Sequence, residues 1–315
     1  MARPRPVWTP PTLAGVSPSR VALPHQGPWP SLVDFLAERL PIIPAATWRE
    51  RLAAGRVLDA QGRALGPESP FLPLAVIWYW RELNHPEPKV PFEAEILHRD
   101  AHLLVVDKPH FLSMAPKGRH LHETVLVRLK QQLGIDTLVP LHRLDRETAG
   151  VVLFSIQPET RHAYHALFSG REIRKVYEAV APWRADLKLP LRLETRLEEP
   201  LDEPFMQMRQ VPGEPNAITL ISLIERQGDL ARYRLEPLTG RRHQLRVQLN
   251  ALGLPMVGDR IYPTLWPEPA LDAPPDFSNP LRLVARAIHF TDPLSGAARS
   301  FESQRVCAFP AEPTA

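Results

Sequence analysis

The sequence contains a single cysteine, Cys307, among its 315 residues. One cysteine excludes an internal disulfide and a metal site built from several cysteines, and it favours a reducing compartment, which we expect to be the cytoplasm. Long apolar runs are also missing. The longest, Phe71 to Trp80, is interrupted by a proline and is too short to span a bilayer, which takes about 20 residues. We expect no membrane association, and no export signal in the proline-broken N-terminus.

Patterns that bind metals or nucleotides are missing as well. The 12 histidines occur without an HExxH or Cys/His pattern, and there is no glycine-rich phosphate loop, so we expect no metal and no other cofactor. The 38 Lys and Arg residues barely exceed the 35 Asp and Glu residues, and a net charge of +3 is a weak indication of an acidic partner. Basic residues do cluster at 171–175 and 241–246. Such clusters are usually solvated surface, with nucleic-acid contact as the alternative.

Proline, by contrast, is abundant: 37 of 315 residues, more than twice the average of about 5%. The excess lies in a leader (1–30), in an insertion at about 263–280, and in the tail. These segments are typical of extended or disordered connectors. They delimit a small module at 31–88 and a larger domain at 89–310, in a chain whose 44% apolar residues suffice for a sizeable core.

Two helix-start patterns and a hairpin predict the small module. Ser31 and Thr47 are each followed three residues later by an acidic residue, which is the pattern of a helix cap, and Gly55 provides a stop. Apolar runs at 57–60 and 74–78 then predict two short strands. The module resembles a diverged S-four-like RNA-binding module of ribosomal proteins. A purely structural lobe is an equally open interpretation.

The larger domain predicts many strands and few helices. Strands are expected at 94–98, 102–106, 138–139, 151–154, 173–181, 191–196, 206–211, 217–224, 231–238 and in two apolar runs within 281–290. Helices are expected at 122–133, 158–168 and 243–252, each ending near a glycine. Because most consecutive strands lack a crossover helix, we predict an α+β domain with a large, mostly antiparallel sheet.

One loop of this domain concentrates unusual charge. Asp145 lies between Arg143 and Arg146, just before the apolar run Val151–Phe154. Nearby positive charge stabilises an ionised carboxylate, and this keeps an anionic nucleophile or base available. An ordinary surface ion pair explains the same local pattern, so charge alone leaves both interpretations open.

The stretch HRLDRETAG, from His142 to Gly150, resembles the catalytic motif of the RluA-type RNA pseudouridine synthases. Three later blocks resemble blocks of that family in the same order, namely 174–177 (RKVY), 239–247 (TGRRHQLRV) and 258–262 (GDRIY). The resemblance covers about residues 90 to 300. The sequence departs from the family pattern at three positions where the family commonly has histidine, namely Gln248, Val284 and Asp292. We expect these departures to affect peripheral packing or substrate choice.

The resemblance implies an isomerase that converts uridine in RNA into pseudouridine, with no metal and no redox step. It implies Asp145 as the catalytic carboxylate, Arg246 as the arginine that pairs with it, and Tyr177 as a residue that stacks on the base and helps to remove the C5 proton. The carboxylate adds to uracil C6, adds to ribose C1′ or removes a ribose proton, and the sequence does not choose among these routes.

The resemblance also implies a set of substrate-binding residues around Asp145. Arg143 is expected to assist the flipping of the target uridine out of its stack. The full set is His142, Arg143, Lys175, Arg241, Arg242, His243 and Gln244. The expected partner is ribosomal RNA of the 23S type, transfer RNA or both, and the expected state is a monomer.

Two other classes of protein compete with this interpretation. An RNA-binding or RNA-chaperone protein with the same fold has no need to keep Asp145, Tyr177 and Arg246 together. A hydrolase with a carboxylate nucleophile is disfavoured because no second catalytic carboxylate or oxyanion pattern lies near Asp145.

Overall fold

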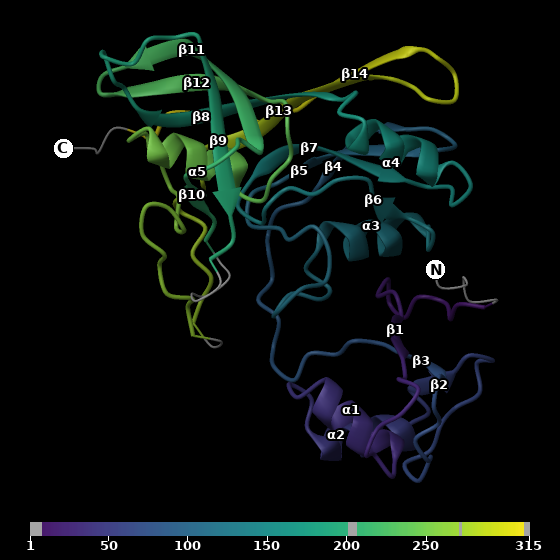
Figure 1. Ribbon diagram of the computed structural model, residues 1–315. Coiled ribbons are helices and arrows are strands. Elements are labelled where there is room, and N and C mark those ends of the chain that lie inside the picture. Colours follow the sequence, from purple (N-terminus) through teal and green to yellow (C-terminus); the bar gives the residue numbers. More distant parts are fainter. Residues whose placement is uncertain (1–7, 201–206, 271–272, 312–315) are drawn as a thin grey trace. The chain divides into compact units, whose positions relative to one another are not determined.

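The computed structural model describes residues 8–200, 207–270 and 273–311 (Figure 1). They form two compact units. The first contains the described residues up to Asn84 together with Val127–Asp136, and the second contains His85–Leu126 and the described residues from Thr137 onward. Within the described ranges, no helix combines the length and the apolar character needed to cross a membrane.

The first unit consists of a small antiparallel sheet and two helices. The strands are β1 (Ser19–Ala22), β2 (Val57–Asp59) and β3 (Val76–Tyr79), in the order β1-β3-β2, and the helices are α1 (Leu32–Arg39) and α2 (Ala45–Ala53). Trp48 is fully buried in the core between them, with its ring edge-on to Tyr79. The two predicted helices and the predicted hairpin of β2 and β3 are therefore confirmed.

The starts of the two helices differ. Ser31 caps α1 as predicted, because its hydroxyl oxygen accepts the backbone N–H of Asp34 at 3.1 Å. The second helix does not start at Thr47. It begins at Ala45 after Pro44, and the N–H of Trp48 already donates to the Pro44 carbonyl at 3.1 Å. Alanine favours helix strongly, and the helix therefore extends beyond the expected cap.

The proline-rich leader is not a connector throughout. Its Ser19–Ala22 segment forms β1, which pairs with β3 from Ser19 opposite Tyr79 to Ala22 opposite Val76. The prediction failed because a strand pairing across more than fifty residues leaves no trace in local composition. Residues 1–7 of the expected leader lie outside the described residues.

The second unit is built on one sheet that has eleven strands in the described part of the chain (Figure 1). The strands are β4 (Glu95–Arg99), β5 (Leu103–Lys108), β6 (Val139–Pro140), β7 (Ala149–Ser155), β8 (Arg174–Pro182), β9 (Leu191–Glu198), β10 (Arg209–Val211), β11 (Ala217–Gln227), β12 (Leu230–Pro237), β13 (Leu283–Thr291) and β14 (Ala298–Glu302). Their order is β10-β9-β11-β12-β8-β13-β7-β5-β4, with β6 beside β7 and β14 beside β13.

Among these strands, β7 and β13 run parallel and the other pairs are antiparallel. The predicted α+β class with a mostly antiparallel sheet is confirmed. The parallel pair meets at Gly150, opposite Ala285. Gly150 has φ +114°, and a Cβ there would lie 2.2 Å from the Ala285 carbonyl oxygen, so only glycine fits this position. The glycine that ends the HRLDRETAG stretch thus joins the two halves of the sheet.

Three further helices are α3 (Val125–Leu133), α4 (Arg161–Ser169) and α5 (Gln244–Ala251). Each predicted helix is present but begins one to three residues later than expected. Gly134 and Gly253 adopt positive φ after α3 and α5, as a helix stop requires. After α4 the left-handed residue is Arg171, with φ +58°, rather than the expected Gly170.

Several expectations for the C-terminal third were wrong. The two apolar runs of 281–290 form the single strand β13, and β14 was not expected. The strand expected at 206–211 begins at Arg209, and Met206 lies outside the described residues. The insertion and the tail are not mere connectors. Phe277 packs 5.2 Å from Phe111, and Cys307 is buried, because both segments cover apolar side chains of the sheet domain.

Candidate active site

A cavity of about 720 Å³ lies in the second unit between the segment 140–148, strand β8 and the segment 237–246. All ten residues expected from the sequence line it, although they come from three distant parts of the chain. They are His142, Arg143, Asp145, Lys175, Tyr177, Arg241, Arg242, His243, Gln244 and Arg246. The cavity volume is within the range of sites that bind small molecules and cofactors.

Asp145 lies on the loop between β6 and β7, as predicted, and its side chain is 32% exposed. Its sequence neighbours do not hold it. Arg146 binds Glu147 at 2.6 Å, and Arg143 is exposed, with no hydrogen bond or ion pair to any described residue. Arg246 instead reaches Asp145, with 3.3 Å between Nη1 and Oδ2. The predicted pairing across about a hundred residues is therefore present.

Arg246 is held from its other side by Asp259. Its Nε and Nη2 donate to the two oxygens of Asp259 at 2.8 and 2.5 Å, and both side chains are 1% exposed. Asp259 also accepts the backbone N–H groups of Ile261 and Tyr262. Burial by itself lowers the pKa of Arg246, but the carboxylates of Asp259 and Asp145 outweigh it and raise this pKa. The guanidinium is thus a fixed positive charge beside Asp145.

The sequence interpretation assigned no role to Asp259. The residue stands in the GDRIY block, and that block was the signal that was available. Without an independent sign that Arg246 is buried, nothing indicated that the arginine needed a second carboxylate. Tyr262 of the same block lies with its ring centre 5.6 Å from the guanidinium carbon of Arg246.

His243 lies between Asp145 and this second loop. Its Nδ1 is 3.1 Å from the Tyr262 hydroxyl, and its Nε2 is 3.8 Å from Oδ1 of Asp145. Burial lowers the pKa of His243 to about 4, although the Asp145 charge acts in the opposite direction. The imidazole is therefore neutral near pH 7. His243 has φ +50° at the start of α5, which turns the chain so that Arg246 faces the cavity.

Tyr177 and Lys175 are neighbours on the same side of β8 and line the cavity together. Burial and then the charge of Asp145 raise the pKa of Tyr177, so its phenol stays protonated. Burial lowers the pKa of Lys175, whose ammonium group lies 3.4 Å from the Thr239 carbonyl oxygen. Both side chains contribute hydrogen-bond donors to the wall of the cavity.

His142 supports the Asp145 loop. Its Nε2 accepts the backbone N–H of Leu153 at 3.1 Å, and its ring stacks on Phe168 with 4.9 Å between centroids. Burial lowers the pKa of His142 to about 3, so the ring is neutral. These contacts favour a role in holding the loop over the expected direct contact with substrate.

Gln244 has a similar internal role. Its side-chain oxygen accepts hydrogen bonds from the Thr239 hydroxyl and from the Arg241 backbone N–H, and its side-chain nitrogen donates to β11 at Ile218 and Thr219. Both ends of the amide are thus engaged inside the protein. The geometry favours Gln244 as the residue that fixes the TGRRHQLRV block to the sheet, and it does not support the expected substrate contact.

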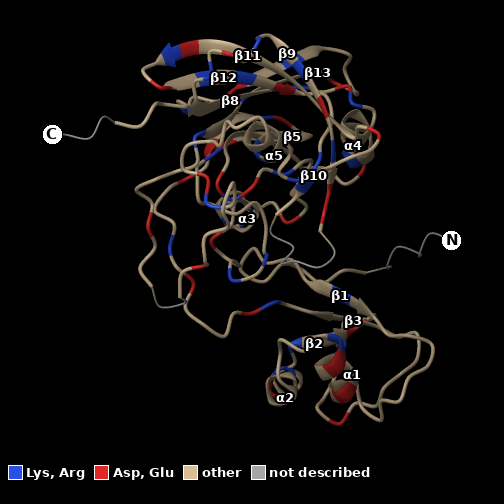
Figure 2. Ribbon diagram, turned by 60° about the vertical axis from the view of Figure 1, so that its left-hand side comes forward, with Lys and Arg blue, Asp and Glu red and all other residues tan. Residues whose placement is uncertain are grey.

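The remaining arginines lie at the open side of the cavity. Arg241 is exposed, with its Nε 3.1 Å from the Asn216 carbonyl oxygen, and Arg242 donates to Glu199 at 2.6 Å. Elsewhere on the sheet acidic and basic residues are interspersed (Figure 2), as in the pairs of Arg192 with Glu194 and Arg196 with Glu198. Three arginines, Arg143, Arg241 and Arg242, line the cavity, and Arg242 is paired with Glu199.

A profile of the RNA pseudouridylate synthase family matches residues 102–251. The chain is 31% identical over 232 residues to an uncharacterized RNA pseudouridine synthase of Synechocystis, covering 73% of this chain and 79% of that one. It is also 31% identical over 227 residues to the dual-specificity RNA pseudouridine synthase RluA of Escherichia coli, covering 70% and 96%. The chain belongs to the RluA-type RNA pseudouridine synthase family.

The solved structures agree with this membership at the level of the fold. Human RNA pseudouridylate synthase domain containing 1 matches with a TM-score of 0.55 at 21% identity, over 70% of this chain and 86% of that one. The synthase is accordingly an isomerase that acts on RNA.

The three departures of this synthase from the family pattern lie in the packing around the cavity. Val284 is buried opposite Ala149 on β7, Gln248 donates to Thr195, and Asp292 accepts the hydroxyl proton of Tyr164 at 3.2 Å. None of the three lines the cavity. Their contacts are consistent with the expected effect on packing.

A buried lysine near the Asp145 loop was not anticipated from the sequence. Lys108, at the end of β5, donates from Nζ to the carbonyl oxygens of Pro109, Leu112 and Arg146 at 2.7 to 3.0 Å. Burial lowers its pKa to about 7. A lysine at a strand end usually lies in solvent, so the sequence carried no sign that this one holds the loop that follows Asp145.

Proposed function

We propose that this synthase isomerises specific uridines in structured RNA, of the 23S ribosomal type, of transfer RNA or of both, with Asp145 as the nucleophile. The observation that supports it is the Asp145 carboxylate, partly open to a cavity and held by a buried arginine. The dual specificity named for the Escherichia coli relative is compatible with either RNA class. The single cysteine favours action in the cytoplasm.

The reaction breaks the bond from N1 to C1′, turns the uracil and forms a bond from C5 to C1′. C5 loses its proton and N1 gains one, so the product has the composition of the substrate. Asp145 starts this sequence by attack at C6, attack at C1′ or removal of a ribose proton. Arg246 keeps the carboxylate aimed in each case, because its own position is fixed by Asp259.

Tyr177 packs against the uracil in this proposal. Its raised pKa keeps the phenol protonated, and this favours stacking and hydrogen-bond donation over action as a free phenolate base. The exposed Arg143 inserts where the uridine has left its stack, or holds the flipped phosphate. Arg241 and Arg242 at the cavity rim contact the RNA backbone.

The test is to map pseudouridines in total RNA from cells with and without the protein. The RNA from cells without it is then treated with purified wild-type protein or with Asp145→Asn. We expect sites that disappear without the protein and return only with the wild type. If no site depends on the protein, the alternative of a silent RNA-binding protein with this fold is favoured; if Asp145→Asn restores a site, Asp145 is not the nucleophile.

A further inference from the structure

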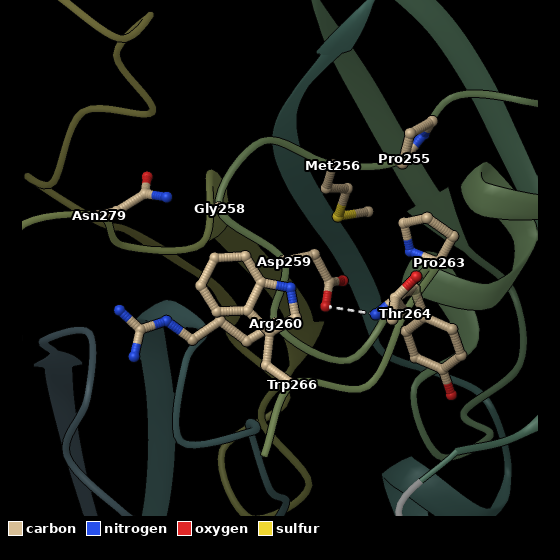
Figure 3. A pocket seen from close by; sticks show the side chains of 10 residues that line it. Pro255, Met256, Gly258, Asp259, Arg260, Pro263, Thr264, Trp266 and Asn279 are labelled. Carbon is tan, nitrogen blue, oxygen red and sulfur yellow. Dashed lines mark hydrogen bonds between the residues drawn. The ribbon is translucent and has the colours of Figure 1, made fainter. Parts of the chain in front are cut away.

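A second cavity, of about 330 Å³, lies beside the GDRIY block and on the proline-rich insertion (Figure 3). Its wall includes Asp259, Arg260, Tyr262, Trp266 and Asn279. No step of the proposed reaction uses this cavity. Trp266 is nevertheless 56% exposed, although it is among the largest apolar side chains. An exposed tryptophan at the wall of a cavity is typical of a binding surface.

The insertion that carries Trp266 is anchored where it begins and where it ends. The N–H of Arg282 donates to the Val257 carbonyl at 2.8 Å, and Gly258 lies so close to Pro280 that a Cβ would be 2.3 Å from its carbonyl oxygen. The two ends of the insertion therefore lie together. Arg119 also donates to the Pro269 carbonyl at 2.9 Å, which ties the middle of the insertion to the sheet domain. A loop held in this way can present a side chain at a fixed position.

The Trp266 ring itself is positioned by Arg260. The backbone N–H of Trp266 donates to the Arg260 carbonyl at 2.8 Å, and the Arg260 guanidinium carbon lies 5.7 Å from the centre of the indole. Figure 3 shows the two side chains next to each other at the cavity. Arg260 also binds Asp276 at 2.8 Å, while its Nε–H has no hydrogen-bond partner among the described residues. An aromatic face beside an arginine is a surface on which a nucleobase stacks and a phosphate binds.

Two residues in the wall of this cavity also contact the groups around Asp145. Asp259 lines it and also holds Arg246, which binds Asp145. Tyr262 lines it as well, and its hydroxyl is 3.1 Å from Nδ1 of His243. The 258–262 loop therefore separates the second cavity from the groups that surround the reacting uridine.

We propose that Trp266 and Arg260 form a second nucleotide-binding site, in which an unpaired base next to the target uridine stacks on the indole and Arg260 contacts a backbone phosphate. This inference rests on the proposed function, since it takes a flipped uridine at Asp145 as given. Flipping one nucleotide removes the stacking partner of its neighbours, and a nearby aromatic ring replaces that partner. The site accepts any base, because every base has a face that stacks.

The binding test uses decauridylate labelled with fluorescein, and measures its Kd by anisotropy. Trp266→Ala should raise the Kd about 10-fold, in line with the loss of one base–aromatic stack. Trp266→Tyr keeps an aromatic face and should stay within about 2-fold of wild type. Leu294→Ala is the matched control, since Leu294 is also an exposed apolar residue but does not line either cavity.

The salt dependence of binding distinguishes the stacking role of Trp266 from the phosphate contact of Arg260. Stacking releases no counterions, so Trp266→Ala should leave the slope of log Kd against log salt unchanged. Arg260→Gln should lower that slope by about 0.7, the value for one phosphate contact to a single strand. Arg226→Gln is the control, because Arg226 lies over the ring of Trp183 in the same way, at 5.4 Å, away from both cavities.

Activity is measured as tritium release from total RNA that carries 5-tritiated uridine, made in cells without the protein. Trp266→Ala should raise KM about 10-fold and leave kcat unchanged, because the flanking base is bound equally in the ground and transition states. The proposal is overturned if Kd and KM of Trp266→Ala stay within 2-fold of wild type, or if Trp266→Tyr is as impaired as Trp266→Ala. If the wild type releases no tritium, the proposed function fails, and the decauridylate measurements still decide on the second site.

Discussion

Two loops each bring an aspartate to the guanidinium of Arg246, and the two carboxylates differ in exposure and in the number of hydrogen bonds that they accept. On the 258–262 loop, Asp259 is 1% exposed and accepts two bonds from Arg246 and two from backbone N–H groups. On the loop between β6 and β7, Asp145 is 32% exposed and accepts a single, longer bond from Arg246. The buried carboxylate positions the arginine, and the exposed one is the nucleophile in the proposed function.

This difference predicts that the two aspartates contribute unequally to the free energy of unfolding. Asp259→Asn should lower the free energy of unfolding by about 3–5 kcal/mol, the usual cost of removing one partner from a buried ion pair. Asp145→Asn should lower it by less than about 1 kcal/mol, since Asp145 is partly exposed and Arg246 retains Asp259. Urea unfolding measures both values.

Asp186→Asn serves as the control for these substitutions. Asp186 pairs with Arg184 on the surface, and its loss should leave the free energy of unfolding nearly unchanged. Equal destabilisation by Asp259→Asn and Asp186→Asn would contradict the positioning role of Asp259.

The arginines at the open rim test whether the exposed side of the cavity faces RNA. Arg241→Ala combined with Arg242→Ala should weaken RNA binding about 20-fold at 0.15 M salt and lower the salt slope by about 1.4, as expected for two phosphate contacts to a single strand. Titration of a labelled RNA at several salt concentrations measures this. Arg192→Ala combined with Arg196→Ala removes the same charge from β9 and should leave the slope unchanged. An unchanged slope in the rim variant would exclude these residues from the interface.

His243, which lies between the two loops, links their packing to pH. Its pKa of about 4 lies below the value of about 6.5 in the unfolded chain. Between these values the unfolded state binds more protons than the folded state, so the stability that is present above pH 6.5 is lost as the pH falls toward 4. His243→Gln should reduce the slope of unfolding free energy against pH in this window by about 1.4 kcal/mol per unit. An unaltered slope would show that His243 is not kept neutral by burial.

Much of the sheet domain was predictable because its strands and helices have strong local patterns. The strands of the sheet domain up to β12 and the helices α3, α4 and α5 lie where apolar alternation, helical spacing and glycine stops indicated, with ends shifted by a few residues. The loop position of Asp145 followed from the same patterns. β1 and β14 were missed because their short, polar sequences form strands only by pairing with β3 and β13.

The roles of single residues in the site were less predictable than its membership. All ten expected residues line one cavity. The side chains of His142 and Gln244, however, form hydrogen bonds within the protein. Asp259 and Lys108 hold the active-site loops although neither was singled out. A sequence pattern marks which residues are near a site, but the direction of a side chain depends on neighbours from distant segments.

By itself, the sequence determined the α+β class, the loop that carries Asp145 and the pairing of Asp145 with Arg246. The class and the loop follow from local periodicity, and the pairing follows from the resemblance of the ordered blocks to the family. The tertiary structure alone decided that Arg246 is shared between an exposed and a buried carboxylate, and that the proline-rich insertion sets Trp266 beside the same loop. Burial and bond direction arise only when distant segments pack together, and so they have no counterpart in the order of residues along the chain.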